Sequence, residues 1–189
     1  AILRKWLIAK FLRERGTIYE FGCGTGVNLA AIAELYPDKE FHGLDFVAPS
    51  SELVNKIGDV YGWNMSGHLF DMQSPDECFR IKGNSAVLTF GAIEQLAGRF
   101  DAFLHFLLKQ APALCISVEP TIEMYDEDYL LDYLAIRFHK KRGYTENYLT
   151  RLRELERQGR IEILNAKRPL FGSLYMEGYT YIVWRPTDP

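Results

Sequence analysis

Hydrophobic and polar residues follow two alternating periods along most of the chain. Near its start, Leu3, Trp6, Leu7 and Phe11 recur at helical spacing, so residues 2–12 are predicted to form a short amphipathic helix. Short apolar runs typical of β-strands follow at residues 17–21, 40–44, 68–70, 86–90 and 113–118. Between these runs, residues 28–36, 49–58 and 100–109 have the spacing of helices. This alternation predicts a parallel sheet with helices on both faces.

The pattern changes after residue 118. Residues 128–139 and 145–158 are predicted to be helices, the second with Thr145 as its N-cap and Gly159 after its end. Two strands, at 161–164 and 179–184, follow with no helix between them and should therefore pair antiparallel. The whole pattern predicts an α/β fold, a three-layer sandwich around a mostly parallel seven-stranded sheet with a terminal antiparallel strand pair.

Composition agrees with a single globular domain that spans residues 1–189. Hydrophobic residues make up 48% of the chain and charged residues 25%. The net charge of -3 gives no strong attraction to nucleic acid, although the segment 137–168 is locally basic. No apolar run reaches the roughly 20 residues that a membrane span needs. The three cysteines are too few and too widely spaced for a disulfide framework or a zinc site, so we expect a cytoplasmic protein without a metal.

A glycine-rich turn joins the first predicted strand to the following helix, with the sequence Glu20-Phe21-Gly22-Cys23-Gly24-Thr25-Gly26. Glycines at alternate positions let the backbone turn sharply and approach a ligand closely. The free N–H groups of the following helix suit a nucleotide-like ligand. A dinucleotide fingerprint would need a third glycine at residue 27 or 29, where the chain has Val27 and Leu29. The spacing therefore argues against a dinucleotide.

The turn instead resembles motif I of the class I methyltransferases, which bind S-adenosylmethionine on a Rossmann-like fold. Asp45 closes the second predicted strand, where that family has an acidic residue for the ribose hydroxyls. Asp71 closes the third strand, where the family commonly has an aspartate for the adenine amino group. Either aspartate alone also fits an ordinary turn, but both together favour the resemblance. The cofactor-binding residues that it implies are Glu20, Gly22, Cys23, Gly24, Gly26, Asp45, Phe46, Asp71, Met72 and Phe90.

The resemblance implies an N-terminal helix at 1–16, a cofactor-binding core at 17–118 and substrate-side helices with the strand pair at 119–189. Because the cofactor motifs occupy the ends of the first three strands, the acceptor should approach from the fourth and fifth. We expect its pocket between the loop 119–125, the turn 139–144 and the loop 171–175. Candidate catalytic residues are Glu119 and His139. Candidate substrate-binding residues are Tyr125, Arg142, Tyr144 and Tyr175.

A small-molecule acceptor is the expected partner: a metabolite, sugar or natural-product intermediate methylated on oxygen or nitrogen. The motif Asp/Asn-Pro-Pro-Tyr, which marks methylases of bases or glutamine, does not follow the fourth predicted strand. Two alternatives stay open. One is an RNA or protein methyltransferase that docks through the basic C-terminal half, and the other is a non-catalytic relative that only binds the cofactor. We expect no membrane partner and a monomer or homodimer.

Overall fold

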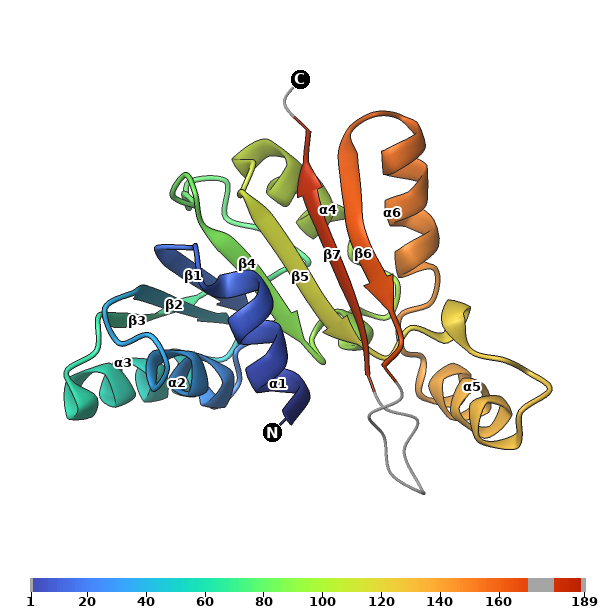
Figure 1. The fold of residues 1–189 in the computed structure, drawn as a ribbon, viewed down its shortest axis with the longest axis horizontal. Helices are drawn as coiled ribbons and strands as arrows, with labels where there is room; N and C mark the ends of the chain where they lie inside the picture. The colour runs from blue at the N-terminus through green and yellow to red at the C-terminus, as the bar shows by residue number, and fades with distance from the viewer. Residues whose placement is uncertain (1, 170–178, 188–189) are drawn as a thin grey trace.

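The computed structural model describes residues 2–169 and 179–187. Its centre is a seven-stranded sheet in the order β3-β2-β1-β4-β5-β7-β6 (Figure 1). The strands are β1 (Thr17–Phe21), β2 (Glu40–Asp45), β3 (Met65–Leu69), β4 (Ala86–Phe90), β5 (Leu114–Glu119), β6 (Ile161–Lys167) and β7 (Thr180–Pro186). Strands β1 to β5 pair parallel, whereas β7 pairs antiparallel with both β5 and β6. The predicted mostly parallel sheet with a terminal antiparallel pair is therefore confirmed.

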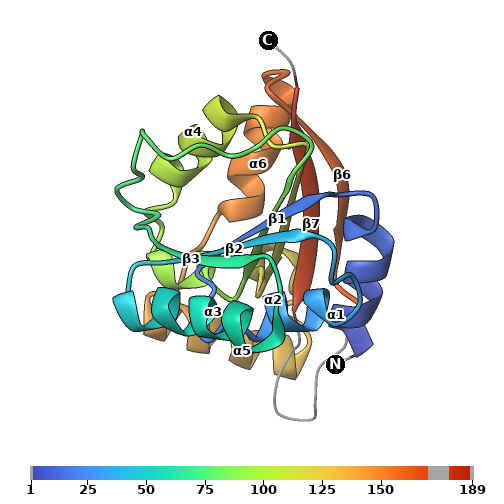
Figure 2. The same ribbon diagram turned by 90° about the vertical axis from the view of Figure 1, so that its left-hand side faces the viewer.

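Helices cover both faces of this sheet, as the alternating pattern predicts. They are α1 (Ile2–Leu7), α2 (Val27–Ala33), α3 (Ala48–Tyr61), α4 (Asp101–Gln110), α5 (Leu130–Arg142) and α6 (Tyr148–Arg157), with short turns η1 (Ile8–Leu12), η2 (Ile93–Leu96) and η3 (Ile122–Met124). Figure 2 shows α1, α2 and α3 on one side of the sheet and α4 and α6 on the other. Helix α5 follows η3 and lies beyond the sheet, at the lower right of Figure 1.

Each face of the sheet has its own hydrophobic core. Ile32 of α2 and Val54 of α3 belong to one buried cluster with Phe41 of β2. Phe103 of α4 and Leu152 of α6 belong to the cluster on the opposite face. All five residues of β1 are buried, because helices cover both of its faces. Among the described residues, no helix is long and apolar enough to cross a membrane.

Three predicted boundaries were wrong in the first half of the chain, the first being the end of α2, which is Ala33 and not residue 36. Strand β3 begins at Met65, three residues before the predicted start, because this edge strand contains the polar residues Ser66 and His68 and lacks an apolar pattern. Helix α3 continues past Gly58 to Tyr61 and is followed by Gly62, which has a left-handed φ of 67°. Gly58 is instead required by packing, since a Cβ there would lie 2.7 Å from the carbonyl oxygen of Met65.

Thr145 is not the N-cap of α6, which begins at Tyr148 after Asn147. Its hydroxyl donates a 2.6 Å hydrogen bond to the carbonyl oxygen of Ile93. It also accepts a hydrogen bond from the N–H of Gly98, at 3.2 Å. Thr145 therefore ties the segment before α6 to the turn η2.

Candidate functional site

The glycine turn lies between β1 and α2, at the edge of the sheet where the parallel strands end. Gly22, Gly24 and Gly26 all have positive φ, between 52° and 72°. The N–H of Gly22 donates to the carbonyl oxygen of Leu44 at 2.7 Å, which fixes the turn to the end of β2. A Cβ on Gly22 would lie 2.4 Å from Cβ of Ala92, so only glycine allows this approach to the loop after β4.

Asp45 connects the end of β2 to the same turn. Its Oδ2 accepts a 2.9 Å hydrogen bond from the N–H of Gly24, and its Oδ1 accepts one of 3.2 Å from the N–H of Val47. The residue is buried, yet it lines a cavity. Each carboxylate oxygen can accept more than one hydrogen bond, so Asp45 retains acceptor capacity toward that cavity.

The cavity beside Asp45 has a volume of about 350 Å³. Asp71 and Met72, which follow β3, form part of its wall together with Phe46. Gln95 and Leu96 of η2 also line it. An apolar slot with carboxylates at its rim suits a nucleoside, whose base is flat and whose ribose and amino groups donate hydrogen bonds. The structure thus brings together Gly22, Asp45, Phe46, Asp71 and Met72, as the resemblance implies.

A second cavity, of about 560 Å³, begins on the other side of the turn and shares Gly22 in its lining. Cys23 and Gly24 form its floor with the start of α2, and Phe90 lies in its wall. The ring of Phe90 packs against Tyr179 at a centroid distance of 5.2 Å. Leu3 and Arg4 of α1 also line this cavity. The N-terminal helix is therefore part of the site.

A row of hydrogen-bonded polar side chains lies beside this second cavity. Glu20 Oε1 accepts a 2.7 Å hydrogen bond from Asn28 Nδ2, and Asn28 Oδ1 accepts one of 3.2 Å from Arg4 Nη1. Glu20 Oε2 and Arg4 Nε are both buried, and neither has a hydrogen-bond partner among the described residues. Burial raises the pKa of Glu20 to about 8, although the Asn28 hydrogen bond, a backbone hydrogen bond from Leu29 and the Arg4 charge oppose that rise. A carboxyl group and a guanidinium thus keep unused hydrogen-bonding capacity here.

Sequence reasoning missed Arg4 and Asn28. Arg4 belongs to an amphipathic helix, where a charged residue is normally read as solvent-facing. Asn28 is the second residue of α2, and its sequence position indicates no partner. Only the packing of α1 near the glycine turn brings the two side chains together. The acidic start of the motif, Glu20, was the one available signal.

Glu119 does not face a cleft, contrary to the sequence-based expectation. It is buried, and its carboxylate accepts backbone hydrogen bonds of 3.2–3.3 Å from Ala92, Ile93 and Glu94. Burial raises its pKa to about 7, against the opposing effect of those N–H donors. The carboxylate therefore fixes the start of η2, the turn that forms one wall of the nucleoside-sized cavity.

The other candidate acceptor residues form a separate group around α5. His139 is buried, and its ring lies 5.3 Å from that of Tyr144 and 6.4 Å from that of Tyr125. Arg142 is exposed and lies over the Tyr144 ring at 5.6 Å. Arg168 covers Tyr125 at 4.1 Å and pairs with the buried Asp132. Neither cavity is lined by the candidates His139, Tyr125, Arg142 and Tyr144. The remaining candidate, Tyr175, lies outside the described residues.

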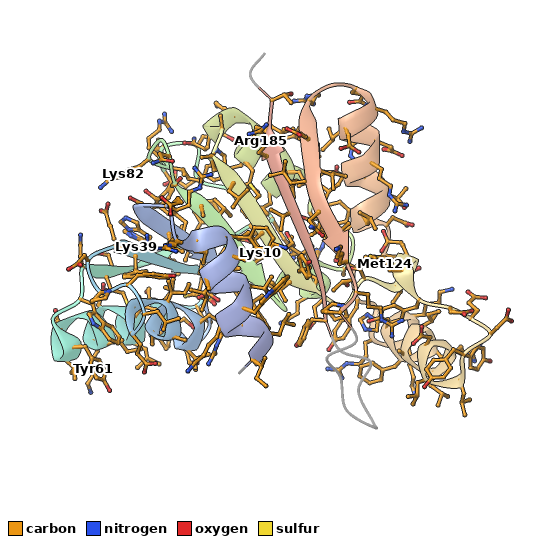
Figure 3. All side chains as sticks on the ribbon, viewed as in Figure 1. Lys10, Lys39, Tyr61, Lys82, Met124 and Arg185 are labelled. Atoms are coloured by element: carbon orange, nitrogen blue, oxygen red, sulfur yellow. The ribbon has the colours of Figure 1, made fainter. Side chains whose placement is uncertain are left out.

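The side chains around α5 pack where this helix meets the sheet. Met124, labelled in Figure 3, lies at that junction and packs against the core cluster of α4 and α6. In the described part of the chain, no three His, Cys, Asp or Glu side chains lie close enough to hold a metal ion.

No protein-family model and no curated protein matches the chain. Among solved structures, it is similar to magnesium protoporphyrin IX methyltransferase (ChlM) from Synechocystis PCC 6803, bound to SAH, with 12% identity and a TM-score of 0.70 over 98% of this chain and 81% of that one. It is also similar to the O-methyltransferase NcsB1 from neocarzinostatin biosynthesis, in complex with S-adenosylmethionine and a naphthoic acid. The identity is 13% and the TM-score 0.66, over 98% of this chain and 56% of that one. The similarity to the [4+2]-cyclase SpnF has 11% identity and a TM-score of 0.73, over 100% of this chain and 81% of that one.

These likenesses establish the fold: a Rossmann-like sandwich of the class I methyltransferase type. The resemblance first indicated by the glycine motif is confirmed at this level. Identities of 11–13% do not transfer a reaction, since one fold can support different chemistries. The printed name of SpnF, a cyclase, illustrates that point.

Proposed function

We propose that this protein binds S-adenosylmethionine and transfers its methyl group to a small-molecule acceptor. The observation that carries the proposal is the pair of cavities that share Gly22 at the carboxyl edge of the sheet. One has the lining of a nucleoside site, and the other adjoins a carboxyl and a guanidinium that suit an amino-acid zwitterion. S-adenosylmethionine joins a nucleoside and an amino acid in one molecule.

The residues on each side fit this cofactor. Asp45 accepts the ribose hydroxyls, while Asp71 and the backbone at Met72 contact the adenine. The unused Oε2 of Glu20 accepts the ammonium group of the methionine moiety. The unused Nε of Arg4 donates to its carboxylate. Both orphaned polar atoms gain a partner in this arrangement, which removes the cost of leaving them buried and unsatisfied.

S-adenosylmethionine supplies a methyl group on a positively charged sulfur, so the protein must mainly align the reactants and exclude water. Orientation of this kind lowers a barrier by roughly 7–11 kcal/mol. Leu3, Phe90 and Tyr179 give the second cavity a largely apolar wall where an acceptor can lie. This wall favours a small apolar or aromatic acceptor, in keeping with the naphthoic acid bound to NcsB1.

The first test is ligand binding measured by calorimetry with S-adenosylmethionine, S-adenosylhomocysteine and NAD. We expect binding of both adenosyl ligands and none of NAD. The Asp45→Asn variant should bind S-adenosylhomocysteine at least about tenfold more weakly, because it loses charge-assisted hydrogen bonds worth roughly 1.5–3 kcal/mol. Asp59→Asn, an exposed position on α3, serves as the matched control and should bind normally. Tight NAD binding without a response to the adenosyl ligands would refute the proposal.

The second test is transfer of an isotopically labelled methyl group to a panel of small acids, phenols and amines. Transfer to one of these compounds supports the proposal. Transfer only to RNA, with binding that falls steeply as salt rises, would instead support docking through the basic segment 137–168. Cofactor binding without transfer to any acceptor class would indicate a non-methylating relative.

A further inference from the structure

Helix α5 has large hydrophobic side chains on its solvent-facing side. Tyr129, Leu130, Tyr133, Leu134 and Phe138 are between 44% and 67% exposed. Their spacing places them on one helical face, whereas Asp132, Ala135, Ile136 and His139 are buried on the other. Figure 1 shows this helix beyond the edge of the sheet, with its outer face uncovered by any labelled element. A contiguous apolar face of this kind marks an interaction surface.

Charges of opposite sign flank this apolar face. Asp126, Glu127 and Asp128 are exposed just before the helix begins. Arg137, Lys140, Lys141 and Arg142 are exposed in its C-terminal half. Glu127, Asp128, Lys140 and Lys141 form no ion pair with the residues that the structure describes. The surface therefore has an acidic end, an apolar centre and a basic end.

We propose that α5 is a self-association surface on which two copies of this chain pair antiparallel about a twofold axis near Leu134. A twofold axis makes the same patch contact itself, so the patch must be self-complementary. Glu127 and Lys141 lie equally far from Leu134 along the chain, as do Leu130 and Phe138. Antiparallel pairing sets the acidic end of each copy against the basic end of the other and covers the apolar centres.

The shape of the basic end agrees with this pairing. A shallow hollow of about 400 Å³ is lined by Arg137, Phe138, Lys140 and Lys141. In the antiparallel register, Leu130 of the second copy lies opposite this hollow. An anionic membrane is a poorer partner, because the carboxylates of residues 126–128 adjoin the apolar face and would be repelled by the lipid headgroups. The self-complementary charges thus favour a second copy over a lipid surface.

The first experiment is sedimentation velocity over a range of protein concentrations. We expect a concentration-dependent dimer whose dissociation constant rises with salt, since the end-to-end pairs are exposed and screened. Leu134→Asp places two carboxylates across the axis and should leave only monomer. Val60→Asp is the matched control, because Val60 is also an exposed apolar residue of a helix, at 67% on α3 against 51% for Leu134. This control should dimerise as the original chain does, and circular dichroism should show both variants folded.

The second experiment tests the register by charge reversal. Glu127→Lys alone and Lys141→Glu alone should each raise the dissociation constant about tenfold, since two attractive pairs become repulsive. An equimolar mixture of the two variants should form a heterodimer at least as stable as the original dimer, because both contacts become complementary again. If the two substitutions merely destabilised α5, mixing the variants would not restore the dimer.

The proposal is overturned by any of three outcomes. The chain could remain monomeric at the highest measurable concentration, or form a dimer that Leu134→Asp leaves intact. It could also remain monomeric and sediment with phosphatidylglycerol vesicles in a Leu134-dependent manner, which would assign the face to a lipid surface. None of these outcomes depends on S-adenosylmethionine binding, so they are independent of the proposed reaction.

Discussion

At the scale of single residues, the site is defined by buried polar atoms that the fold leaves without partners. Glu20 Oε2 and Arg4 Nε are the clearest cases, since Asn28 bonds to Oε1 of the same carboxylate and to Nη1 of the same guanidinium. A protein interior normally satisfies such atoms. In the proposed function, the ammonium and carboxylate groups of the cofactor's methionine moiety give these two atoms their partners.

Glu20 should couple proton uptake to ligand binding. Burial places its pKa at about 8, above the ordinary value of 4.5, so the free protein holds this proton near neutral pH. Its contribution to stability is therefore full below 4.5 and is lost as pH rises through about 8. An ammonium group beside Oε2 favours the carboxylate, so S-adenosylhomocysteine binding should release up to one proton near neutral pH.

Calorimetry in buffers of different ionisation enthalpy measures this release directly. Glu20→Gln should bind with a heat that does not depend on the buffer, because the exchanging proton is gone. The control ligand is 5′-methylthioadenosine, which lacks the amino-acid moiety and should release no proton. Equal buffer dependence for both ligands would show that the proton comes from another group.

At the scale of elements, the site depends on close contacts between loops that end different strands. The turn after β1 approaches the loop after β4 so closely that Gly22 has no room for a side chain. The loop after β4 is in turn held by Glu119 from β5 and by Thr145 from the segment before α6. The wall formed by the loop after β4 therefore depends on β5 and on the segment before α6, whose residues Glu119 and Thr145 do not line the cavity themselves.

Gly22→Ala should destabilise the protein and abolish cofactor binding. The new Cβ would lie 2.4 Å from Cβ of Ala92, and the residue keeps a φ of 69° that costs roughly 1–2 kcal/mol for a non-glycine residue. Gly62→Ala is the matched control, because Gly62 has a φ of 67° but no atom within 4 Å of the new Cβ. Urea unfolding should show the smaller loss for Gly62→Ala, with S-adenosylhomocysteine binding retained. Equal losses would mean that backbone strain alone decides the effect.

Glu119→Gln should weaken cofactor binding as well as lower stability. The substituted amide would face backbone N–H groups, and an unsatisfied buried donor costs about 1–3 kcal/mol. A residue that contacts only the acceptor would instead change turnover and leave cofactor affinity unaltered. Glu123→Gln is a suitable control, since Glu123 also accepts a backbone N–H, from Thr150, but lies away from η2. Unchanged S-adenosylhomocysteine affinity in Glu119→Gln would show that cofactor binding does not depend on Glu119 fixing the start of η2.

At the scale of the whole molecule, the sheet has a half-buried polar cluster near its edge strand β3. His42 Nδ1 lies 2.9 Å from His68 Nε2, and His42 Nε2 lies 3.2 Å from Glu40 Oε1. Tyr19 stacks on His42 at 4.6 Å, and Lys82, labelled in Figure 3, pairs with Glu40. The His–His hydrogen bond needs an acceptor nitrogen, so at least one ring must stay neutral.

Acidification should therefore destabilise the fold through this cluster. Burial lowers the pKa of both His42 and His68 below the ordinary value of 6.5, with Glu40 opposing the shift at His42. Their stabilising contribution is present above 6.5 and is lost as pH falls below it, because the unfolded chain then binds more protons. Urea unfolding as a function of pH measures this loss.

The variant His68→Gln should show a flatter stability profile below 6.5 than the original chain. His105→Gln, at an exposed position on α4, should keep the original profile. Comparing the two variants also removes the opposing contribution of the buried glutamates, which both share. An unaltered acid slope in His68→Gln would show that the histidine pair does not control it.

The sequence by itself determined the local elements and the cofactor half of the candidate site. Apolar runs such as 86–90 predict strands because a parallel strand buried on both faces needs apolar residues throughout. The glycine turn, Asp45 and Asp71 are predictable because they follow strands directly. Parallel strands bring their carboxyl ends to one edge, so topology alone gathers these residues.

Only the tertiary structure decided which distant side chains meet. Glu119 ends a strand as the other site residues do, yet it points to backbone N–H groups rather than to a cleft. Arg4 reaches the site only because α1 packs near the glycine turn. Arg4 and its partner Asn28 are far apart in the sequence, and no local pattern links them. The physical reason is that strand and helix periods follow from neighbouring residues, whereas burial and hydrogen-bond partners depend on how separate elements pack.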